Sequence, residues 1–302
     1  MANAEHLAKL RRGADQWTKW RTEHPQVEPD LSEADLSSVD LSGIDLSRTN
    51  LWGVNLAGAK LTAANLTGVI LSTAYLSHAV LKDAILSQAE LANAMLVWAD
   101  LTGADLADAN LIGADLRGAK LRGANLSYAN LIGTEIWGID LREANLGNAD
   151  LQRTNLSEAL LIAANLNNAN LNRANLYRAE GSRSHLYRTN LHKASLVEAY
   201  FMGAYLVEAN LSEANLTGAN FAWADLSWGN LAEADLKGTN LRGAMLRTAN
   251  LSNANLAGAN LRGANLSKTN LAGANLYEAE LREANLSQAN LQGTTMPDGA
   301  VY

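Results

Sequence analysis

The hydrophobic positions of this chain recur every five residues. From Leu31 to Leu291 every fifth residue is Leu. The exceptions are Ile136, Gly181, Phe201 and Phe221. The residue two places before each of these positions is small, usually Ala, and the residue directly before it is mostly Asp or Asn. Self-similarity at a fixed period is typical of repeat architectures, so the repeat is the first guide to the fold.

A period of five fits neither an ordinary helix nor a straight strand. On an α-helix, five steps of about 100° rotate each Leu by roughly 140° from the last, which scatters the leucines around the axis. On a straight strand, an odd spacing places successive leucines on opposite faces. All of them can face one interior only if the backbone turns once in each repeat. Asp, Asn and the frequent Gly favour such turns, so the pattern predicts a solenoid of short strands.

The motif Ala-(Asp/Asn)-Leu-x-x resembles the pentapeptide-repeat family over residues 31–291, without an insertion. The resemblance implies an all-β fold, a right-handed quadrilateral β-helix with four repeats in each coil. Residues 20 apart in sequence would then be neighbours in successive coils. The segments 17–21 and 295–299 are also similar to the ends of cyanobacterial members of that family.

Residues 1–30 lie outside the repeat. The residues that share one face there at helical spacing are Leu7, Leu10, Ala14 and Trp17. Pro25 and Pro29 prevent a helix from continuing. We expect one short amphipathic helix that covers the open end of the first coil, with a helix that docks a partner or a membrane as the alternative. The expected organisation is an N-terminal helical cap and linker (1–30), the β-helix (31–296) and a C-terminal tail (297–302).

The composition gives no sign of catalytic or metal chemistry. The chain has no Cys, which excludes disulfides, Cys-ligated zinc and a thiol nucleophile. No two His residues have metal-ligand spacing, and each carboxylate occupies a repeat corner. We therefore expect no enzyme activity, metal, cofactor or small-molecule substrate. No run of about 18 apolar residues could span a membrane, and no signal segment is visible, so the expected location is the cytoplasm.

Some outward positions break the polar rule of the repeat. With 20 residues in a coil, one face collects Tyr75, Met95, Val97, Trp98, Arg117 and Trp137. Aromatic residues, Met and Arg are enriched at protein interfaces, and Trp is frequent at their energetic centres. We expect this face to bind a protein partner. The alternative is that these large side chains only shield the backbone of the corners.

A second group lies near Gly181, the one Leu position that has no side chain. The glycine is compatible with a bulge, a cavity or a functional irregularity. The residues predicted to share a face near it are Leu160, Ile162, Tyr200, Met202 and Trp223. They form a second candidate protein-binding patch.

These observations predict a non-catalytic protein-interaction scaffold, and the resemblance implies a regulatory role in a cyanobacterium, for example in heterocyst differentiation. The alternative implied by the family is a DNA mimic that binds DNA gyrase or another DNA-binding protein. A duplex carries one charge per about 1.7 Å, so a solenoid of ~60 Å would need roughly 35 charges. The formal net charge of −7 is far smaller. Its acidic sign also argues against direct nucleic-acid binding.

The end of the repeat leaves one coil edge with nothing beyond it except a short tail. An open edge of backbone N–H and C=O groups is a template for pairing with another chain. We therefore expect either a monomer whose tail covers this edge or a dimer formed through it.

Overall fold

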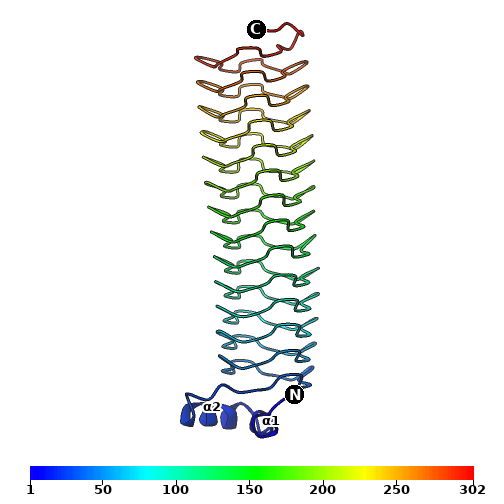
Figure 1. Cartoon of the computed structure of the whole chain (residues 1–302), viewed down its shortest axis with the longest axis vertical. Coiled ribbons are helices and arrows are strands. Elements are labelled where there is room, and N and C mark those ends of the chain that lie inside the picture. The colour runs from blue at the N-terminus through cyan, green and yellow to red at the C-terminus, as the bar shows by residue number, and fades with distance from the viewer. The chain divides into compact units, whose positions relative to one another are not determined.

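The computed structural model describes residues 1–302. It contains two α-helices, α1 (Ala4–Arg11) and α2 (Ala14–Glu23), followed by a solenoid. Two compact units divide the chain, Met1–Asn145 and Leu146–Tyr302. Within each unit, successive coils of the chain stack on one another (Figure 1). The N-terminal unit (1–145) and the C-terminal unit (146–302) are described separately below.

The coils have a period of 20 residues in both units. The residue before each Leu position forms a parallel β-bridge with the residue 20 positions later, as Asp35 does with Asn55 and Asn190 with Asn210. The Leu itself donates its N–H to the next coil, for example from Leu36 to the carbonyl of Asn55 at 2.8 Å. Since four repeats of five residues complete one coil, the quadrilateral β-helix expected from the sequence is confirmed.

Each corner of a coil is a β-turn. The carbonyl of Leu101 accepts the N–H of Ala104 at 3.0 Å, and Gly103 between them has a φ of 70°. A positive φ at this place is what a type II turn requires. Leu101 and Ala104 point inward and are fully buried. The turn thus makes a spacing of five compatible with one apolar interior, while the two residues at its tip face outward.

The Asp or Asn before each Leu joins the turn to the preceding coil. The Oδ1 atom of Asn125 accepts the backbone N–H of Ser127 at 3.2 Å. Its Nδ2 atom donates to Oδ1 of Asp105 at 2.8 Å, and it accepts in turn from Asn145 at 3.0 Å. Asn can both donate and accept, whereas an ionised Asp only accepts. Asn can therefore occupy any coil of such a ladder, and Asp suits the coil at which the ladder begins, because there it only has to accept.

The N-terminal cap differs from the prediction in having two helices instead of one. The helix is interrupted at Gly13, whose φ of 102° is outside the helical range, and α2 begins directly after this residue. As a result, Ala14 is exposed and does not share a buried face with Leu10 and Trp17. Neither helix is long and apolar enough to cross a membrane.

Both helices lie across the open end of the first coil (Figure 1). Trp17 is fully buried there, and its indole N–H donates to the carbonyl of Asp45 at 2.6 Å. The guanidinium of Arg21 donates to the carbonyls of Val27 and Ser47 at 2.8 and 2.9 Å. The bonds to Asp45 and Ser47 fix α2 onto the coil and satisfy carbonyls that have no preceding coil, and the bond to Val27 ties α2 to the linker.

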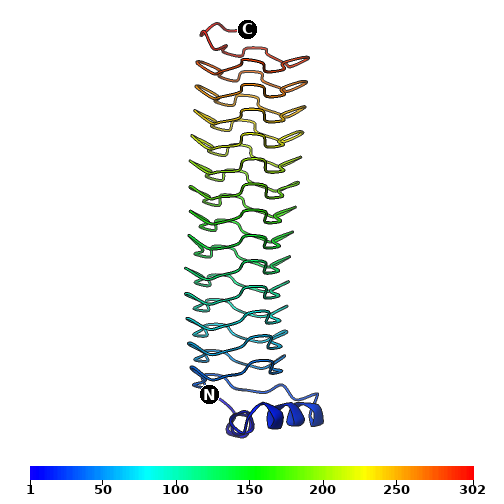
Figure 2. The same ribbon diagram turned by 180° about the vertical axis from the view of Figure 1, so that it is seen from behind.

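In the C-terminal unit, the tail folds back on the last repeat (Figure 2). Thr295 and Val301 form an antiparallel bridge, and Tyr302 donates its N–H to the carbonyl of Thr294 at 2.9 Å. The tail does not cover the whole coil, because Leu281 and Leu286 are half-buried where the leucines of earlier coils are fully buried.

Gly181 marks neither a bulge nor a cavity. Its N–H donates to the carbonyl of Tyr200 at 2.7 Å, so the coil keeps its regular course. A Cβ atom at this position would overlap the ring of Phe201. Phe201 in turn stacks on Phe221, with ring centroids 5.5 Å apart. The missing side chain of one coil is therefore replaced by the large side chain of the next.

This size match predicts a strong coupling between the two positions. Gly181→Leu alone should destabilise the C-terminal unit by about 1–3 kcal/mol, because the new side chain overlaps the Phe201 ring. Phe201→Leu alone should also destabilise it, because space opens above Gly181. The double variant restores Leu over Leu, and its loss should fall below the sum of the single losses by at least ~1 kcal/mol in denaturant unfolding. Additive losses would contradict the interpretation.

A second prediction concerns the stability of the N-terminal unit at low pH. Hydrogen bonds from the Ser42 hydroxyl and backbone lower the pKa of Asp40, and those from Arg142 lower the pKa of Asp140. A carboxyl whose pKa is lower in the folded state stabilises it above the unfolded value of about 3.9, and this contribution is lost as the pH falls through the folded value. Hydrogen exchange, corrected for intrinsic rates, should therefore show faster opening of the N-terminal unit below about pH 4. Asp140→Asn should reduce that pH dependence, and an unchanged profile would count against it.

Candidate protein-binding surfaces

The first candidate face lies in the N-terminal unit, and the structure brings its residues together. Tyr75 and Met95 form a bridge in successive coils, and both side chains are exposed. Beside them is a pocket of about 270 Å³ in a mainly apolar setting. It is lined by Val97, Trp98, Arg117, Gly118, Trp137 and Gly138. All six residues predicted from the sequence therefore lie on this face, which we call the Trp98 face.

Trp98 owes its position to a glycine one coil later. It occupies the third place of a turn, with a φ of 60°, and its N–H donates to the carbonyl of Arg117 at 3.0 Å. A Cβ atom on Gly118 would overlap the indole ring, so the ring lies directly over the Gly118 backbone. The other side of the ring faces solvent, and 62% of the residue is exposed. Trp98 is thus a large apolar surface that is already held in place.

The charge of Arg117 is neutralised within the face. Its Nε and Nη2 atoms donate to the two carboxylate oxygens of Asp115 at 2.8 and 2.6 Å. These hydrogen bonds lower the pKa of Asp115 and raise that of Arg117. A bidentate pair of this kind also fixes the guanidinium plane. The Trp98 face therefore presents aromatic rings beside an ordered and compensated ion pair.

The second candidate patch lies in the C-terminal unit, and the structure gathers only part of it. Tyr200, Met202 and Trp223 are each at least half exposed in successive coils. Tyr205, which the sequence analysis missed, is exposed on the next side of the same coil. Leu160 and Ile162 are half-buried and lie two coils before Tyr200, with Glu180 between Leu160 and Tyr200.

Trp223 repeats the arrangement of Trp98. Its φ is 62°, its N–H donates to the carbonyl of Arg242 at 2.9 Å, and its ring lies over the backbone of Gly243. The Arg242 guanidinium carbon lies 5.9 Å from the centre of the ring. The signal in the sequence is a Trp at the third place of a turn followed 19 and 20 residues later by Arg-Gly. It could have been found once the coil length was known.

A larger pocket, of about 420 Å³, separates α2 from the first coils. Its lining is polar and includes Thr18, Arg21, Thr22, Ser47, Arg48 and Thr67. Arg21 is already bonded to the carbonyls of Val27 and Ser47. Of the groups that line this pocket, Arg21 holds α2 against the coil.

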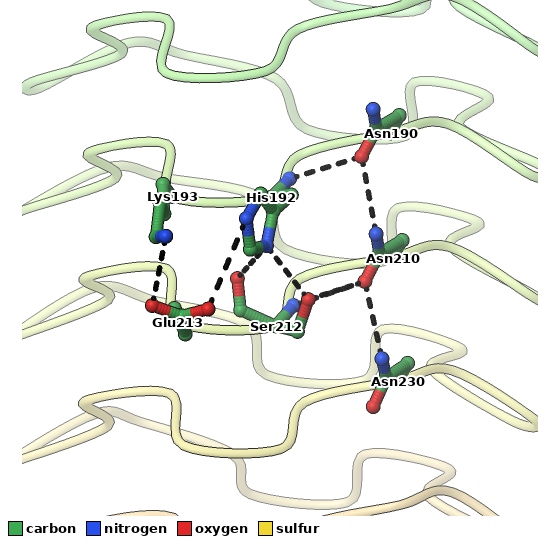
Figure 3. A network of polar contacts seen from close by, with 7 residues as sticks. All are labelled: Asn190, His192, Lys193, Asn210, Ser212, Glu213 and Asn230. Carbon is green, nitrogen blue, oxygen red and sulfur yellow. Dashed lines mark hydrogen bonds and ion pairs between the residues drawn. The ribbon is translucent and has the colours of Figure 1, made fainter.

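One His, Ser and Glu cluster superficially resembles a catalytic triad (Figure 3). Nδ1 of His192 lies 2.9 Å from Oγ of Ser212 and 3.0 Å from the carbonyl oxygen of the same residue. A carbonyl can only accept, so Nδ1 carries the proton and cannot take one from the hydroxyl. The Ser212 hydroxyl donates instead to Oδ1 of Asn210 at 2.8 Å. This is a scaffold contact and lacks the hydroxyl-to-imidazole bond of a nucleophile.

Glu213 completes the same cluster as an ion-pair partner of Lys193, at 3.1 Å (Figure 3). Its other oxygen lies 3.9 Å from Nε2 of His192, which is too long for a hydrogen bond. No group of three or more His, Asp or Glu side chains is placed to hold a metal ion.

Several solved structures are similar to this chain. HetL, a pentapeptide repeat protein involved in heterocyst differentiation regulation in the cyanobacterium Nostoc, is 29% identical over 94% of this chain and 98% of its own, with a TM-score of 0.29. Rfr23 from the cyanobacterium Cyanothece is 25% identical over 54% of this chain and 88% of its own, with a TM-score of 0.17. QnrB1, a plasmid-mediated fluoroquinolone resistance protein, is 20% identical over 66% of this chain and 91% of its own, with a TM-score of 0.48. No curated protein sequence is significantly similar.

The family model for Pentapeptide repeats matches the chain in eight copies. The matched residues are 30–68, 70–106, 99–138, 139–178, 184–221, 194–231, 219–258 and 254–293. These matches span most of the region in which the structure shows coils with a 20-residue period. The chain belongs to the pentapeptide-repeat family.

Proposed function

We propose that this protein is a non-catalytic scaffold that binds a protein partner through the Trp98 face. The observation that carries the proposal is the apolar pocket of about 270 Å³ between Trp98, Val97 and Trp137. Most other outward positions of the coils hold small or polar residues. Exposed rings around a pocket are typical of the residues that dominate binding energy at protein interfaces.

The geometry of the Trp98 face supports binding because its side chains are already held in place and need little further ordering when a partner binds. The Trp98 ring is already packed on the Gly118 backbone, and Arg117 is held by two bonds to Asp115. Immobilising a flexible side chain on binding costs about 0.5–1.5 kcal/mol, and a preorganised face avoids much of that cost.

The proposed cellular role is regulatory, in a cyanobacterium, with heterocyst differentiation as the specific proposal. It is supported by family membership and by the likeness of segments 17–21 and 295–299 to the ends of cyanobacterial members. HetL is described as involved in the regulation of heterocyst differentiation.

The charge distribution favours a scaffold over a DNA mimic. Two exposed carboxylates of the C-terminal unit are paired with guanidinium groups of the preceding coil, in Arg178–Glu198 and Arg188–Glu208, both at 2.7 Å. Such pairs cancel the field that a continuous acidic surface would project. The likeness to QnrB1 shows the fold alone.

The first prediction concerns the exposed apolar groups themselves. Trp98→Asp, alone and with Met95→Asp, should leave the fold intact because both side chains point outward. Binding of the partner, first identified by affinity capture from the native host, should weaken by at least about 2 kcal/mol in titration calorimetry. Trp52→Asp is the matched control, since Trp52 is an exposed Trp of the same unit outside the face. Unchanged affinity in the folded double variant would exclude the Trp98 face.

The second prediction concerns the platform beneath the ring. Gly118→Ala should displace the Trp98 ring, because the new methyl group overlaps it, and should weaken binding of the same partner at least about tenfold. Gly123→Ala is the control: Gly123 has a similar φ, 66° against 68°, but open space at its Cβ position. Both variants carry the same backbone strain, and Ala63 shows that the turn accepts Ala. Equal effects of the two substitutions would mean that ring position is irrelevant.

A further inference from the structure

Among the arginines at the second place of a turn, two classes can be separated by the residue two places earlier. Where the residue two places earlier is Asp, the guanidinium is neutralised by a bidentate pair. Arg142 donates to Asp140 at 2.8 and 2.6 Å in the same way as Arg117 donates to Asp115. Where that residue is Asn or Met, no carboxylate is available at this spacing.

Three arginines of the C-terminal unit belong to the second class. The residues two places before Arg242, Arg247 and Arg262 are Asn240, Met245 and Asn260. All three arginines are exposed, and none forms an ion pair. Lys268 is likewise exposed and unpaired. Between Asp235 and Glu278 the sequence contains no acidic residue.

These four cations frame one side of two successive coils. Arg242 and Arg247 occupy the turns at the two ends of the strand through Met245, and Arg262 and Lys268 occupy the corresponding turns of the next coil. The bond from Gly243 N–H to the carbonyl of Arg262, at 2.9 Å, joins the two turns at one corner. We call the side that carries Arg242, Arg247, Arg262 and Lys268 the basic side.

Aromatic rings border the basic side on the preceding coil. The N–H of Trp223 donates to the carbonyl of Arg242 at 2.9 Å, and that of Trp228 donates to the carbonyl of Arg247 at 3.0 Å. Both rings are more than half exposed. Met245 and Tyr205 are exposed on the same side. An apolar surface therefore leads directly into an unpaired group of cations.

Acidic residues limit the length of this surface. Asp225 forms bridges with Tyr205 and Met245 and so lies at the aromatic end. Glu280 forms a bridge with Asn260 at the opposite end, and Glu283 is paired there with Arg282 at 3.3 Å. A complementary ligand must be short and apolar at one end, and its anionic part must be about as long as two stacked coils.

We propose that the basic side and Trp223 form a second docking surface, which binds an acidic protein segment with an apolar residue next to a short run of Asp or Glu. The apolar residue rests on Trp223, and the carboxylates pair with Arg242 and Arg262. Charge complementarity identifies this occupant, because these four cations lie within a stretch, 236–277, that contains no acidic residue, although the chain has a net charge of −7. The surface is independent of the Trp98 face.

A nucleic-acid strand fits this surface less well. Single-strand binding needs a basic groove that follows the backbone together with stacking platforms along it. Here the Trp223 and Trp228 rings lie on the coil that precedes the cations, and no ring lies between the cations. The carboxylates of Asp225, Glu280 and Glu283 at the two ends of the surface would repel the phosphates of a strand. A short acidic peptide avoids those carboxylates.

The test uses the full chain and a fluorescein-labelled peptide with one Leu followed by about six alternating Asp and Glu residues, in fluorescence anisotropy at about 50 mM salt. Arg242→Ser together with Arg262→Ser should weaken binding at least about tenfold. Ser fits this place of the turn, as Ser252 shows with its N–H bonded to Asn250. Trp223→Ser should also weaken binding.

The matched control is Arg153→Ser with Arg173→Ser, which removes the same charge from exposed turn residues on other coils of the C-terminal unit. This variant should keep the affinity within about twofold. Equal losses in the two double variants would show a general charge effect and overturn the proposal. So would an oligothymidylate that binds as tightly as the peptide, or no peptide binding by the unaltered protein at about 100 µM.

Discussion

The hydrogen bonds between successive coils are the interaction on which both units depend. A single coil has turns but no partner for its strand N–H and C=O groups, so its structure exists only against a neighbour. The Leu N–H to carbonyl bonds provide one part of this pairing, and the Asn side-chain ladder provides another. Stability is therefore distributed along the chain and does not depend on a single centre.

Different positions of the repeat maintain the fold and carry the surface residues, so binding residues can be added without disturbing the fold. The inward Leu, the small residue and the ladder residue are constrained, while the two residues at the tip of each turn are not. Trp98, Arg117, Trp223 and Arg242 all occupy turn tips. Polar, charged and aromatic residues occur there in different coils, which suits a scaffold whose surfaces differ from unit to unit.

The period of five predicted a solenoid of short strands, because every Leu can face one interior only if the backbone turns once in each repeat. The coil of four repeats was implied by the resemblance to the pentapeptide-repeat family. The remaining features depend on what a side chain meets one coil away. The break at Gly13 and the Phe201 ring over Gly181 are examples. The composition of the Trp98 face followed from the coil of 20 residues that the resemblance implied. The support of Trp98 by Gly118 did not, because it depends on how the ring is turned.

The net charge of the chain also conceals how its charged side chains are paired locally. The total of −7 gave no indication that some arginines are neutralised locally and others are not. For arginines at the second place of a turn, an Asp two residues earlier makes this difference, as the paired Arg117 and the unpaired Arg242 show. Asp at that place closes its own turn, and the ion pair is a consequence of the same geometry.

The Gly181 and Phe201 pair has a consequence for how the repeat finds its register. With Leu over Leu and Ala over Ala in nearly every coil, a slip by one whole coil would change few contacts, and the correct stacking would be poorly distinguished from shifted ones. A slipped Phe201 would meet the side chain of Leu161 instead of the open space at Gly181. One complementary pair of a small and a large residue in an otherwise uniform interior thus favours a single alignment of the C-terminal coils.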